Sequence, residues 1–292
     1  MGRRSRWRRA ARLLARLSAQ MGQGARNASQ ISRRVTEMHN LFDLQGHVAL
    51  VTGGNGGLGL AMAKGLVKCG ASVAIWGRNA DKNAAAIAEL EALGGTARSF
   101  VADVMDPVSS AAAFAETLAA FGRIDSCFAN AGGSGVRGAF TNLDRDDWLQ
   151  THELNVMSVI DTFQLAIRHW KAAGSGGKLI VTSSVAALLG LPNSAGYCMT
   201  KASVTGLVRS LAIELGRSGI QVNAILPGFI ETEMSLNTPK AFQDGCRRRA
   251  ASGTIGQLQD MEGIAVYLAS QQSNFMTGQS LVLDGGHTIF PL

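Results

Sequence analysis

The chain has 292 residues, of which 46% are apolar, so it is long enough to bury the core of one large α/β domain. Its formal net charge is +7, but residues 1–37 contain ten arginines and a single acid. Residues 38–292 keep 18 of the 28 basic and 20 of the 21 acidic side chains, which disfavours a basic nucleic-acid-binding face there.

We interpret residues 1–37 as a disordered, arginine-rich extension, for which two explanations stay open. Leu13, Leu14 and Leu17 lie at helical spacing among the arginines, as in an organellar transit peptide or a membrane-surface helix. Alternatively, Met38 is the true start and the extension results from a start codon placed too early. An organellar location is expected only if the extension is genuine.

Cysteine spacing and hydropathy bear on the compartment of the rest of the chain. The four cysteines lack CxxC or CxxH spacing, and no apolar run approaches the about 18 to 20 residues of a membrane span. The five histidines share no metal-ligand spacing. The sequence therefore predicts a cytoplasmic protein with reduced thiols, no metal site and no integral membrane segment.

Residues 38–292 alternate short β-branched apolar runs with helical stretches. The first run, HVALVT, is followed by a glycine-rich turn and a helical stretch that ends at Lys68, and the second, ASVAIWG, is followed by the alanine-rich DKNAAAIAELEAL. Seven runs occur in all, at residues 47–52, 71–77, 97–103, 124–130, 178–184, 220–226 and 279–284. This order predicts α/β class: a single Rossmann-like, doubly wound domain with a seven-stranded parallel sheet. In such sheets ligands bind at the carboxyl ends of the strands.

The stretch TGGNGGLG, residues 52–59, lies between the first strand and the first helix. Glycines there let the backbone approach a pyrophosphate, whose charge the helix N-terminus favours. One possible frame, GxGxxG, expects an acidic residue about 20 positions later, but none occurs before Asp81. The other frame, TGxxxGxG, uses Gly53, Gly57 and Gly59.

A second stretch, GYCMTK, places one of the two tyrosines of the chain, Tyr197, four positions before Lys201. At this spacing the two side chains share one face of a helix. A lysine ammonium beside a phenol favours the phenolate, so the pair is typical of a proton donor and the group that lowers its pKa. The same spacing also occurs on solvated helix faces.

With these two motifs the chain resembles the short-chain dehydrogenase/reductase superfamily in its one-domain form, over residues 44–286. Four further motifs follow the order and spacing of that family: ANAG at 129–132, Asn155 in ELNVMS, SS at 183–184 and PGFIET at 227–232. The resemblance implies an NAD(P)-dependent oxidoreductase that moves a hydride between a nicotinamide cofactor and a carbonyl or secondary alcohol. It also implies a homotetramer or homodimer.

The resemblance assigns four catalytic residues. Tyr197 is the expected general acid of reduction and general base of oxidation, and Lys201 is expected to lower its pKa and to bind the nicotinamide ribose. Ser184, 13 positions before Tyr197, is expected to hold the substrate oxygen, whereas Ser183 points to the opposite face of the strand. Asn155 is expected to anchor a water relay behind the lysine.

The resemblance also implies a set of cofactor contacts. Asp103 is expected at the adenine, and Asn130 is expected to link the central strands near the adenosine ribose. Thr232 is expected to bind the nicotinamide carboxamide or the phosphates, with a helix N-cap as the alternative. The complete set is Gly53, Asn55, Gly57, Leu58, Gly59, Arg78, Asp103, Val104, Asn130, Tyr197, Lys201, Pro227, Gly228, Ile230 and Thr232.

The end of the second strand, AIWGRN, bears on the choice between NADP and NAD. NAD-preferring members of the family usually carry an aspartate there, whereas this chain has Gly77 and Arg78. Because a guanidinium suits a 2′-phosphate, NADP is expected, with NAD as the alternative. NADP-preferring relatives often have a second basic residue just before the middle glycine of the loop, and this chain departs from that pattern with Gly56.

The residues around the expected substrate pocket are apolar. They predict a moderately apolar small-molecule ketone or alcohol, such as a cyclic alcohol, a steroid-like molecule or a 3-oxoacyl thioester. The arginines of CRRRAA, residues 246–251, lie where the family has a mobile lid, and contact with an acidic substrate is the minor alternative to solvation. The alternative function is a non-catalytic nucleotide-binding scaffold or regulator, against which the intact catalytic set argues. The apolar residues around the expected substrate pocket are Leu188, Leu189, Leu191, Phe229 and Ile230.

Overall fold

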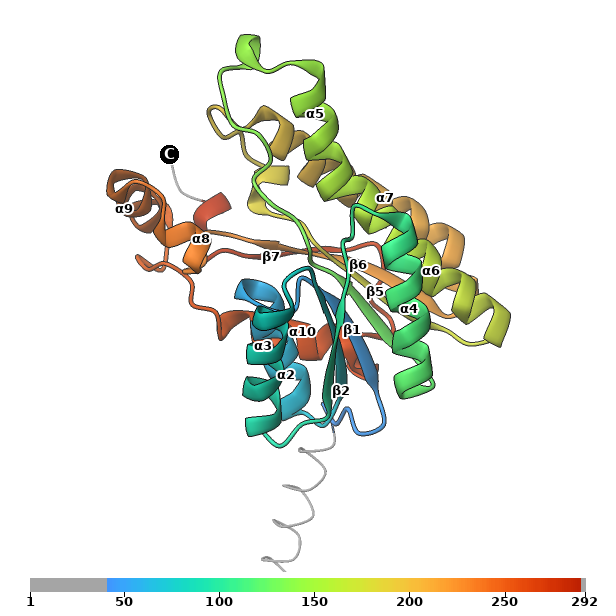
Figure 1. Cartoon of the computed structure of the whole chain (residues 1–292). Coiled ribbons are helices and arrows are strands. Elements are labelled where there is room, and N and C mark those ends of the chain that lie inside the picture. Colours follow the sequence, from blue (N-terminus) through green and yellow to red (C-terminus); the bar gives the residue numbers. More distant parts are fainter. Residues whose placement is uncertain (1–40, 290–292) are drawn as a thin grey trace, which may run out of the picture. The chain divides into compact units, whose positions relative to one another are not determined.

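The computed structural model describes residues 41–289 (Figure 1). The chain divides into two units, Met1–Asp43 and Leu44–Leu292, and the second contains every strand of the sheet. The extension predicted at residues 1–37 lies outside the described residues, so its interpretation and the boundary at residue 38 stay predictions. Within the described residues, no helix combines the length and apolarity needed to cross a membrane.

Seven parallel strands form one sheet in the order β3-β2-β1-β4-β5-β6-β7, which confirms the predicted fold class. The order reverses between β1 and β4, and dinucleotides bind at such a reversal, outside the carboxyl ends of the strands. The strands are β1 (Val48–Thr52), β2 (Ser72–Gly77), β3 (Ala97–Val101), β4 (Ser126–Ala129), β5 (Gly177–Thr182), β6 (Ile220–Pro227) and β7 (Ser280–Leu283).

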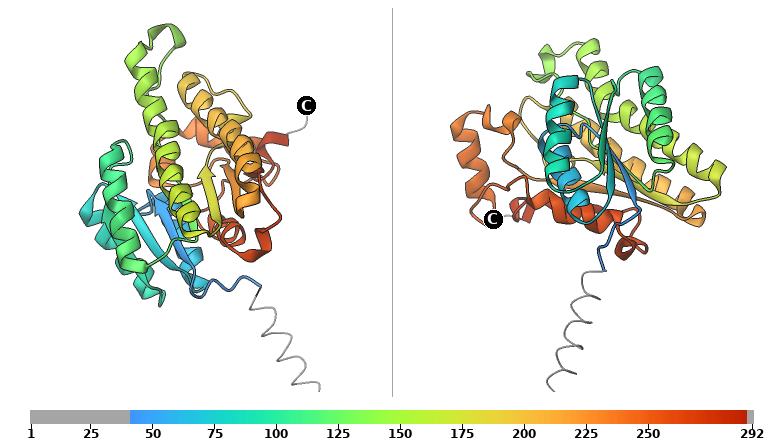
Figure 2. Two further views of the ribbon diagram at one scale, coloured as in Figure 1. Left: turned by 90° about the vertical axis from the view of Figure 1, so that its right-hand side faces the viewer. Right: turned by 60° about the horizontal axis from the view of Figure 1, so that its bottom comes forward.

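Helices cover both faces of the sheet (Figures 1 and 2). One face packs on α2 (Gly57–Lys68), α3 (Ala80–Ala92) and α10 (Asp260–Ala269). The other packs on α4 (Pro107–Phe121), α6 (Ser158–Ala173) and α7 (Ala195–Leu215). Further helical elements include α5 (Arg145–His152), the π-helical turn η2 (Glu153–Met157), α8 (Glu233–Leu236) and α9 (Lys240–Arg249).

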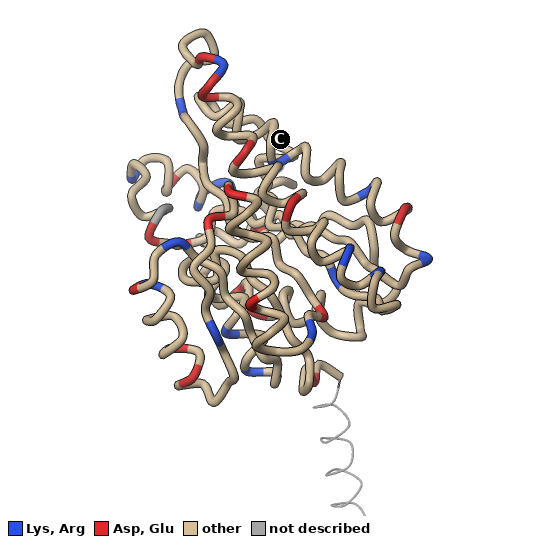
Figure 3. The backbone as a smooth tube through the Cα atoms, turned by 45° about the vertical axis from the view of Figure 1, so that its right-hand side comes forward, with Lys and Arg blue, Asp and Glu red and all other residues tan. Residues whose placement is uncertain are grey.

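The alternation of side chains along β1 explains why both faces are apolar. Leu50 points into the cluster that includes α4, α6 and α7, whereas Ala49 and Val51 point into the cluster that includes α2, α3 and α10. All five residues of β1 are buried, as expected for a parallel sheet covered on both sides. Basic and acidic residues are interspersed along the described backbone (Figure 3).

Two predicted strands, β3 and β5, end two residues earlier than their sequence pattern indicated, and in both cases a polar side chain turns the backbone. After β3, Asp103 Oδ1 accepts a hydrogen bond from the Met105 amide at 3.0 Å. After β5, Ser184 Oγ accepts one from the Ala186 amide at 3.1 Å and begins a short 3₁₀ turn. Residues that sequence patterning assigned to strand ends are thereby left outside the ladder, at the carboxyl edge of the sheet.

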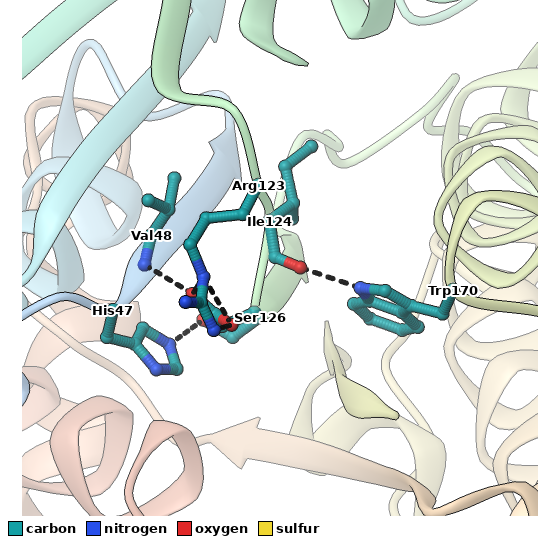
Figure 4. Close-up of polar contacts among 7 residues, drawn as sticks. His47, Val48, Arg123, Ile124, Ser126 and Trp170 are labelled. Carbon is teal, nitrogen blue, oxygen red and sulfur yellow. Dashed lines mark hydrogen bonds and ion pairs between the residues drawn. The ribbon is translucent and has the colours of Figure 1, made fainter. Parts of the chain in front are cut away.

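The opposite, amino-terminal ends of β1 and β4 are joined by polar contacts (Figure 4). The Val48 amide donates to Asp125 Oδ2 at 2.8 Å, and His47 Nε2 lies 2.8 Å from Ser126 Oγ. Trp170 of α6 donates from Nε1 to the Ile124 carbonyl at 2.6 Å. These contacts fix the two central strands and leave their carboxyl ends for the site.

Candidate functional site

The loop between β1 and α2 needs glycine at the positions of the TGxxxGxG frame. Gly53 and Gly57 have φ of +62° and +48°, a region that side-chain-bearing residues rarely adopt. A Cβ on Gly59 would overlap the Gly53 carbonyl oxygen, whereas a Cβ on Gly56 would meet no atom within 4 Å. The backbone amides at the start of α2 are thus placed to bind a pyrophosphate.

Asn130 links the glycine loop to the central strands. Its Nδ2 donates to the carbonyl oxygens of Thr52 at 3.1 Å and Gly53 at 3.3 Å. Its Oδ1 accepts from Thr182 Oγ1 at 3.1 Å. One side chain therefore holds β1, β4 and β5 together beside the loop, in agreement with the linking role proposed from the sequence.

Ser184, Tyr197 and Lys201 come together at the carboxyl end of β5 and the start of α7. The Ser184 side chain lies close enough to the Tyr197 phenol to lower its pKa, and Lys201 Nζ lies 5.7 Å from the centre of the Tyr197 ring. Ser183 points away and donates from Oγ to the Lys201 carbonyl at 2.8 Å. Of the two neighbouring serines, Ser184 is the one beside the phenol.

The electrostatics of this group correct one expectation from the sequence. Burial raises the pKa of the Tyr197 phenol, and the hydrogen bond with Ser184 only partly opposes that effect. Lys201 is 6% exposed, burial lowers its pKa to about 8, and its Nζ donates to the Thr182 carbonyl at 2.9 Å. In the protein alone, the net shift of the Tyr197 pKa is therefore upward, opposite to the expected direction, because desolvation is its largest cause.

Asn155 lies behind Lys201, in the π-helical turn η2, and is almost fully buried. Its Oδ1 accepts from the Gly133 amide and its Nδ2 donates to the Gly133 carbonyl, both at 3.0 Å. A Cβ on Gly132 would lie 2.9 Å from Asn155 Oδ1 and 3.4 Å from Lys201 Nζ, so the two side chains converge on one glycine. The π-helical turn thus points Asn155 at the loop after β4.

Arg78 and Asp103 lie together where β2 and β3 end. Arg78 Nη1 is 3.9 Å from Asp103 Oδ2, and the Arg78 side chain is 71% exposed. An ion pair of this length between exposed groups holds the guanidinium weakly. Arg78 is therefore available to an anionic ligand at this edge of the sheet.

The remaining predicted contacts lie around the same edge. Thr232 caps α8, accepting at Oγ1 from the Ser235 amide at 3.1 Å, and its Cγ2 lies 3.9 Å from the place of a Cβ on Gly57. It is therefore both the N-cap and a neighbour of the glycine loop. Pro227 ends β6, and the Gly228 amide donates to Leu283 at 2.9 Å. Leu58 is partly buried, Val104 is buried, and Ile230 is buried and pairs with Gly256.

The sequence interpretation missed Asn83, on the buried side of α3. Its Oδ1 accepts from Asn55 Nδ2 at 2.7 Å, so α3 reaches the glycine loop. The signal in the sequence was a polar residue on the stripe that Ala86 and Leu90 continue at i+3 and i+7. Thr182 was also missed as the residue whose carbonyl holds Lys201.

A groove of about 460 Å³ lies between α9 and the loop that leads from Ser184 to α7. Of the predicted apolar residues, Leu189 and Leu191 line it from the loop, whereas Leu188, Phe229 and Ile230 are not in its lining. Arg249 and His287 also line it. Phe229 packs edge-on against Phe242 of α9, with ring centres 5.6 Å apart. The groove therefore combines apolar walls with two basic side chains.

Known proteins share this arrangement over most of the chain. A family model described as enoyl-(acyl carrier protein) reductase matches residues 53–288. The chain is 37% identical to gluconate 5-dehydrogenase of Gluconobacter oxydans, with 86% of this chain and 98% of the relative covered. It is 35% identical to an L-rhamnose 1-dehydrogenase (NAD(P)(+)) of a Sphingomonas species, with 83% and 96% covered.

Solved structures agree with these relatives. A 7α-hydroxysteroid dehydrogenase complexed with NADH and 7-oxo glycochenodeoxycholic acid matches with a TM-score of 0.81 at 30% identity, covering 84% of this chain and 96% of that one. A short-chain dehydrogenase/reductase variant of Serratia marcescens matches with a TM-score of 0.78 at 32% identity, covering 84% and 99%. The range that the family model matches includes the glycine loop from Gly53 onward, the Tyr197 helix and the end of β6.

Proposed function

The chain belongs to the short-chain dehydrogenase/reductase superfamily, and we propose that four of its residues carry the chemistry: Ser184, Tyr197, Lys201 and Asn155. It is an NAD(P)-dependent oxidoreductase that acts on alcohol and carbonyl carbons. The observation that supports this assignment is the contact between Ser184 and Tyr197 with a buried lysine behind the phenol. No feature of a binding scaffold requires a buried ammonium beside a partly buried phenol. The nicotinamide cofactor supplies and accepts the hydride when it is bound.

The described residues fit such a cofactor. The positive-φ glycines and the close approach at Gly59 leave a side-chain-free cradle at the N-terminus of α2, which suits a pyrophosphate. Asp103 stands at the end of β3, where we assign it to the adenine, and Thr232 stands across from Gly57. We assign Lys201 to the nicotinamide ribose, because its ammonium has hydrogen-bonding capacity beyond the one bond to Thr182.

The proton steps belong to the chain itself. In reduction, Tyr197 donates its hydroxyl proton to the carbonyl oxygen, and Ser184 holds that oxygen with a hydrogen bond. In oxidation, the phenolate accepts the proton of the alcohol. Lys201 stabilises the phenolate by its charge, and Asn155 keeps the lysine pocket in shape through its bonds to Gly133. Burial of Lys201 and partial burial of Tyr197 strengthen this interaction relative to water.

We propose that the enzyme prefers NADP, because Arg78 is an accessible cation at the end of β2. Arg78→Asp replaces a charge-assisted phosphate contact by repulsion, and charged hydrogen bonds are worth about 1.5 to 3 kcal/mol. The preference for NADPH over NADH, measured as the ratio of kcat/KM values, should fall by about 10- to 100-fold. Arg98→Asp at the amino end of β3 is the matched control, with the same charge change away from the site, and should leave the ratio unchanged.

Two results would contradict this assignment. Unchanged NADPH kinetics in Arg78→Asp would remove Arg78 from the cofactor site. A wild-type preference for NADH would overturn the proposed preference for NADP.

The substrate we propose is a small, moderately apolar alcohol or ketone that fits the groove beside Leu189 and Leu191. Arg249 and His287 in the same groove add the capacity to hold a hydroxylated or acidic tail. A substrate panel of cyclohexanol, a hydroxysteroid, gluconate and rhamnose, followed by absorbance of the reduced cofactor, tests both parts. Turnover of none of the four compounds, with either cofactor, would contradict the proposed substrate class.

We also propose a cytoplasmic homo-oligomer. Within the described residues, none of the four cysteines forms a disulfide, which supports a reducing compartment. Apolar side chains of Leu149, Met199 and Ile213 are exposed on the neighbouring helices α5 and α7, which supports association of subunits there. Light scattering coupled to gel filtration measures the subunit number, and a monomer would contradict the proposal.

A further inference from the structure

Asn83 is a polar side chain in a place that suits an apolar one. It is 2% exposed and lies on the buried stripe of α3 with Ala86 and Leu90. A leucine of similar size would fill this position without an amide to desolvate, and burying an amide costs free energy unless it is hydrogen bonded. The contacts of the amide must therefore account for its presence.

Those contacts fix the orientation of the Asn83 carboxamide. Its Nδ2 donates to the Gly77 carbonyl at 2.9 Å and to the Phe100 carbonyl at 3.4 Å, at the ends of β2 and β3. Both donors are thereby used, so Oδ1 must be the atom that meets Asn55, whose Nδ2 donates to it at 2.7 Å. The direction of the bond from Asn55 to Asn83 follows from the two carbonyl acceptors.

The same contacts place the Asn55 carboxamide on the end of β2. A Cβ on Gly77 would overlap both Asn55 Nδ2 and Asn83 Oδ1, so the pair of amides lies directly against the Gly77 backbone. Arg78 is the next residue along the chain. The amide nitrogen of Asn55 therefore lies at the carboxyl end of β2, next to the guanidinium that we assign to the 2′-phosphate.

Asn55 has one donor left for a ligand. Its Nδ2 carries two hydrogens, and the described residues supply an acceptor for one of them, Asn83 Oδ1. A phosphate on the adenosine ribose presents three acceptor oxygens, whereas the 2′-hydroxyl of NAD presents one. The remaining N–H of Asn55 is thus better matched to NADP.

We propose that Asn83 is a positioning residue for NADP: it holds the Asn55 carboxamide beside Arg78, where Asn55 donates to the 2′-phosphate. This inference rests on the NADP preference proposed above. It also accounts for the absence of a second basic residue at Gly56, because a fixed neutral donor at the neighbouring position takes that role. A side chain at position 77 would overlap Asn55 and Asn83, so the amide pair requires glycine there, and the NAD-type aspartate is absent from the same place.

Asn83→Leu tests the proposal, because it keeps the buried volume and removes the acceptor for Asn55. The KM for NADPH should rise by about 10-fold, while the KM for NADH rises less than about 3-fold and kcat with either cofactor stays within about 2-fold. The melting temperature without cofactor should change little, because relief from burying an amide offsets the bonds lost at the Gly77 and Phe100 carbonyls. A purely structural role would instead lower the melting temperature and affect both cofactors alike.

Asn55→Ala is the second variant, and it should raise the KM for NADPH to the same extent. Because one interaction is removed in either case, the double variant should show no further increase. Asn79→Ala, which removes the N-cap of α3 without touching Asn55, is the matched control and should lower stability while leaving the cofactor ratio unchanged.

Three results would overturn the inference. The first is an unchanged KM for NADPH in Asn83→Leu, with the wild type still preferring NADPH, which would leave the proposed NADP preference intact. The second is an equal rise in KM for both cofactors, and the third is additive effects in the double variant. A wild-type preference for NADH would overturn the inference together with the proposed cofactor.

Discussion

Tyr197→Phe should lower kcat by about 10²- to 10⁴-fold, the loss typical of a missing general acid, while the KM for NADPH changes by less than about 2-fold. The ring of Tyr197 packs in the same place without its hydroxyl, so the pocket keeps its shape. The substitution removes the hydroxyl group that interacts with Ser184 and that we assign to the substrate oxygen. Steady-state kinetics on a substrate that the wild type accepts measures the effect.

Tyr267→Phe is the matched control for this prediction. Tyr267 is the second tyrosine of the chain and lies on α10, which packs on α2. Removal of its hydroxyl should leave kcat within about 2-fold of the wild-type value. If Tyr197→Phe instead keeps near-normal turnover, Tyr197 is not the proton donor, and GYCMTK is a helix segment with no part in proton transfer.

The strand pattern and the glycine spacing were sufficient to predict the sheet and the loop. Strands such as β1 are buried on both faces, so they appear in the sequence as unbroken apolar runs, and the backbone needs of Gly53, Gly57 and Gly59 leave a local signature. The spacing from Ser184 to Tyr197 likewise depends on one loop and one helix. Such short-range constraints are visible without the fold.

Other features depended on groups far apart in the sequence. The pKa of Tyr197 is set by how much of the protein surrounds it, and the spacing to Lys201 shows nothing of that burial. The hydrogen bond between Asn55 and Asn83 joins residues 28 positions apart, and both side chains lie against Gly77 at the end of β2. Desolvation and long-range hydrogen bonds of this kind become visible only when the elements are packed.

Lys201→Met should lower kcat by at least about 100-fold and stabilise the protein at neutral pH. Lys201 is buried, its pKa is lowered to about 8 from the model-peptide 10.5, and one carbonyl oxygen receives its hydrogen bond. Holding the ammonium in this environment costs about 3 kcal/mol at pH 7, from about 1.4 kcal/mol per pKa unit. The variant also loses the hydrogen bond to Thr182, which destabilises the folded protein by about 1 kcal/mol. The net gain in the free energy of unfolding is therefore expected to be about 2 kcal/mol.

The pH dependence gives this prediction its sign. Between pH 8 and 10.5 the unfolded chain binds the Lys201 proton while the folded protein has lost it, so the stability of the wild type rises with pH across that window. Below pH 8 the lysine is charged in both states, and the full cost is present. The advantage of Lys201→Met, measured by urea unfolding without cofactor, should therefore be largest at pH 7 and shrink toward pH 10.

Lys178→Met separates burial from catalysis. Lys178 is a second buried lysine whose pKa burial lowers to about 8, but it lies at the amino end of β5 and donates to Ser273 Oγ and Asn274 Oδ1. Its replacement should change stability over the same pH window and leave kcat within about 2-fold, whereas Lys201→Met lowers kcat by at least about 100-fold. If the two variants lose activity equally, Lys201 acts through the fold and not through the phenol. If Lys201→Met unfolds like the wild type from pH 7 to 10, the Lys201 ammonium is not desolvated.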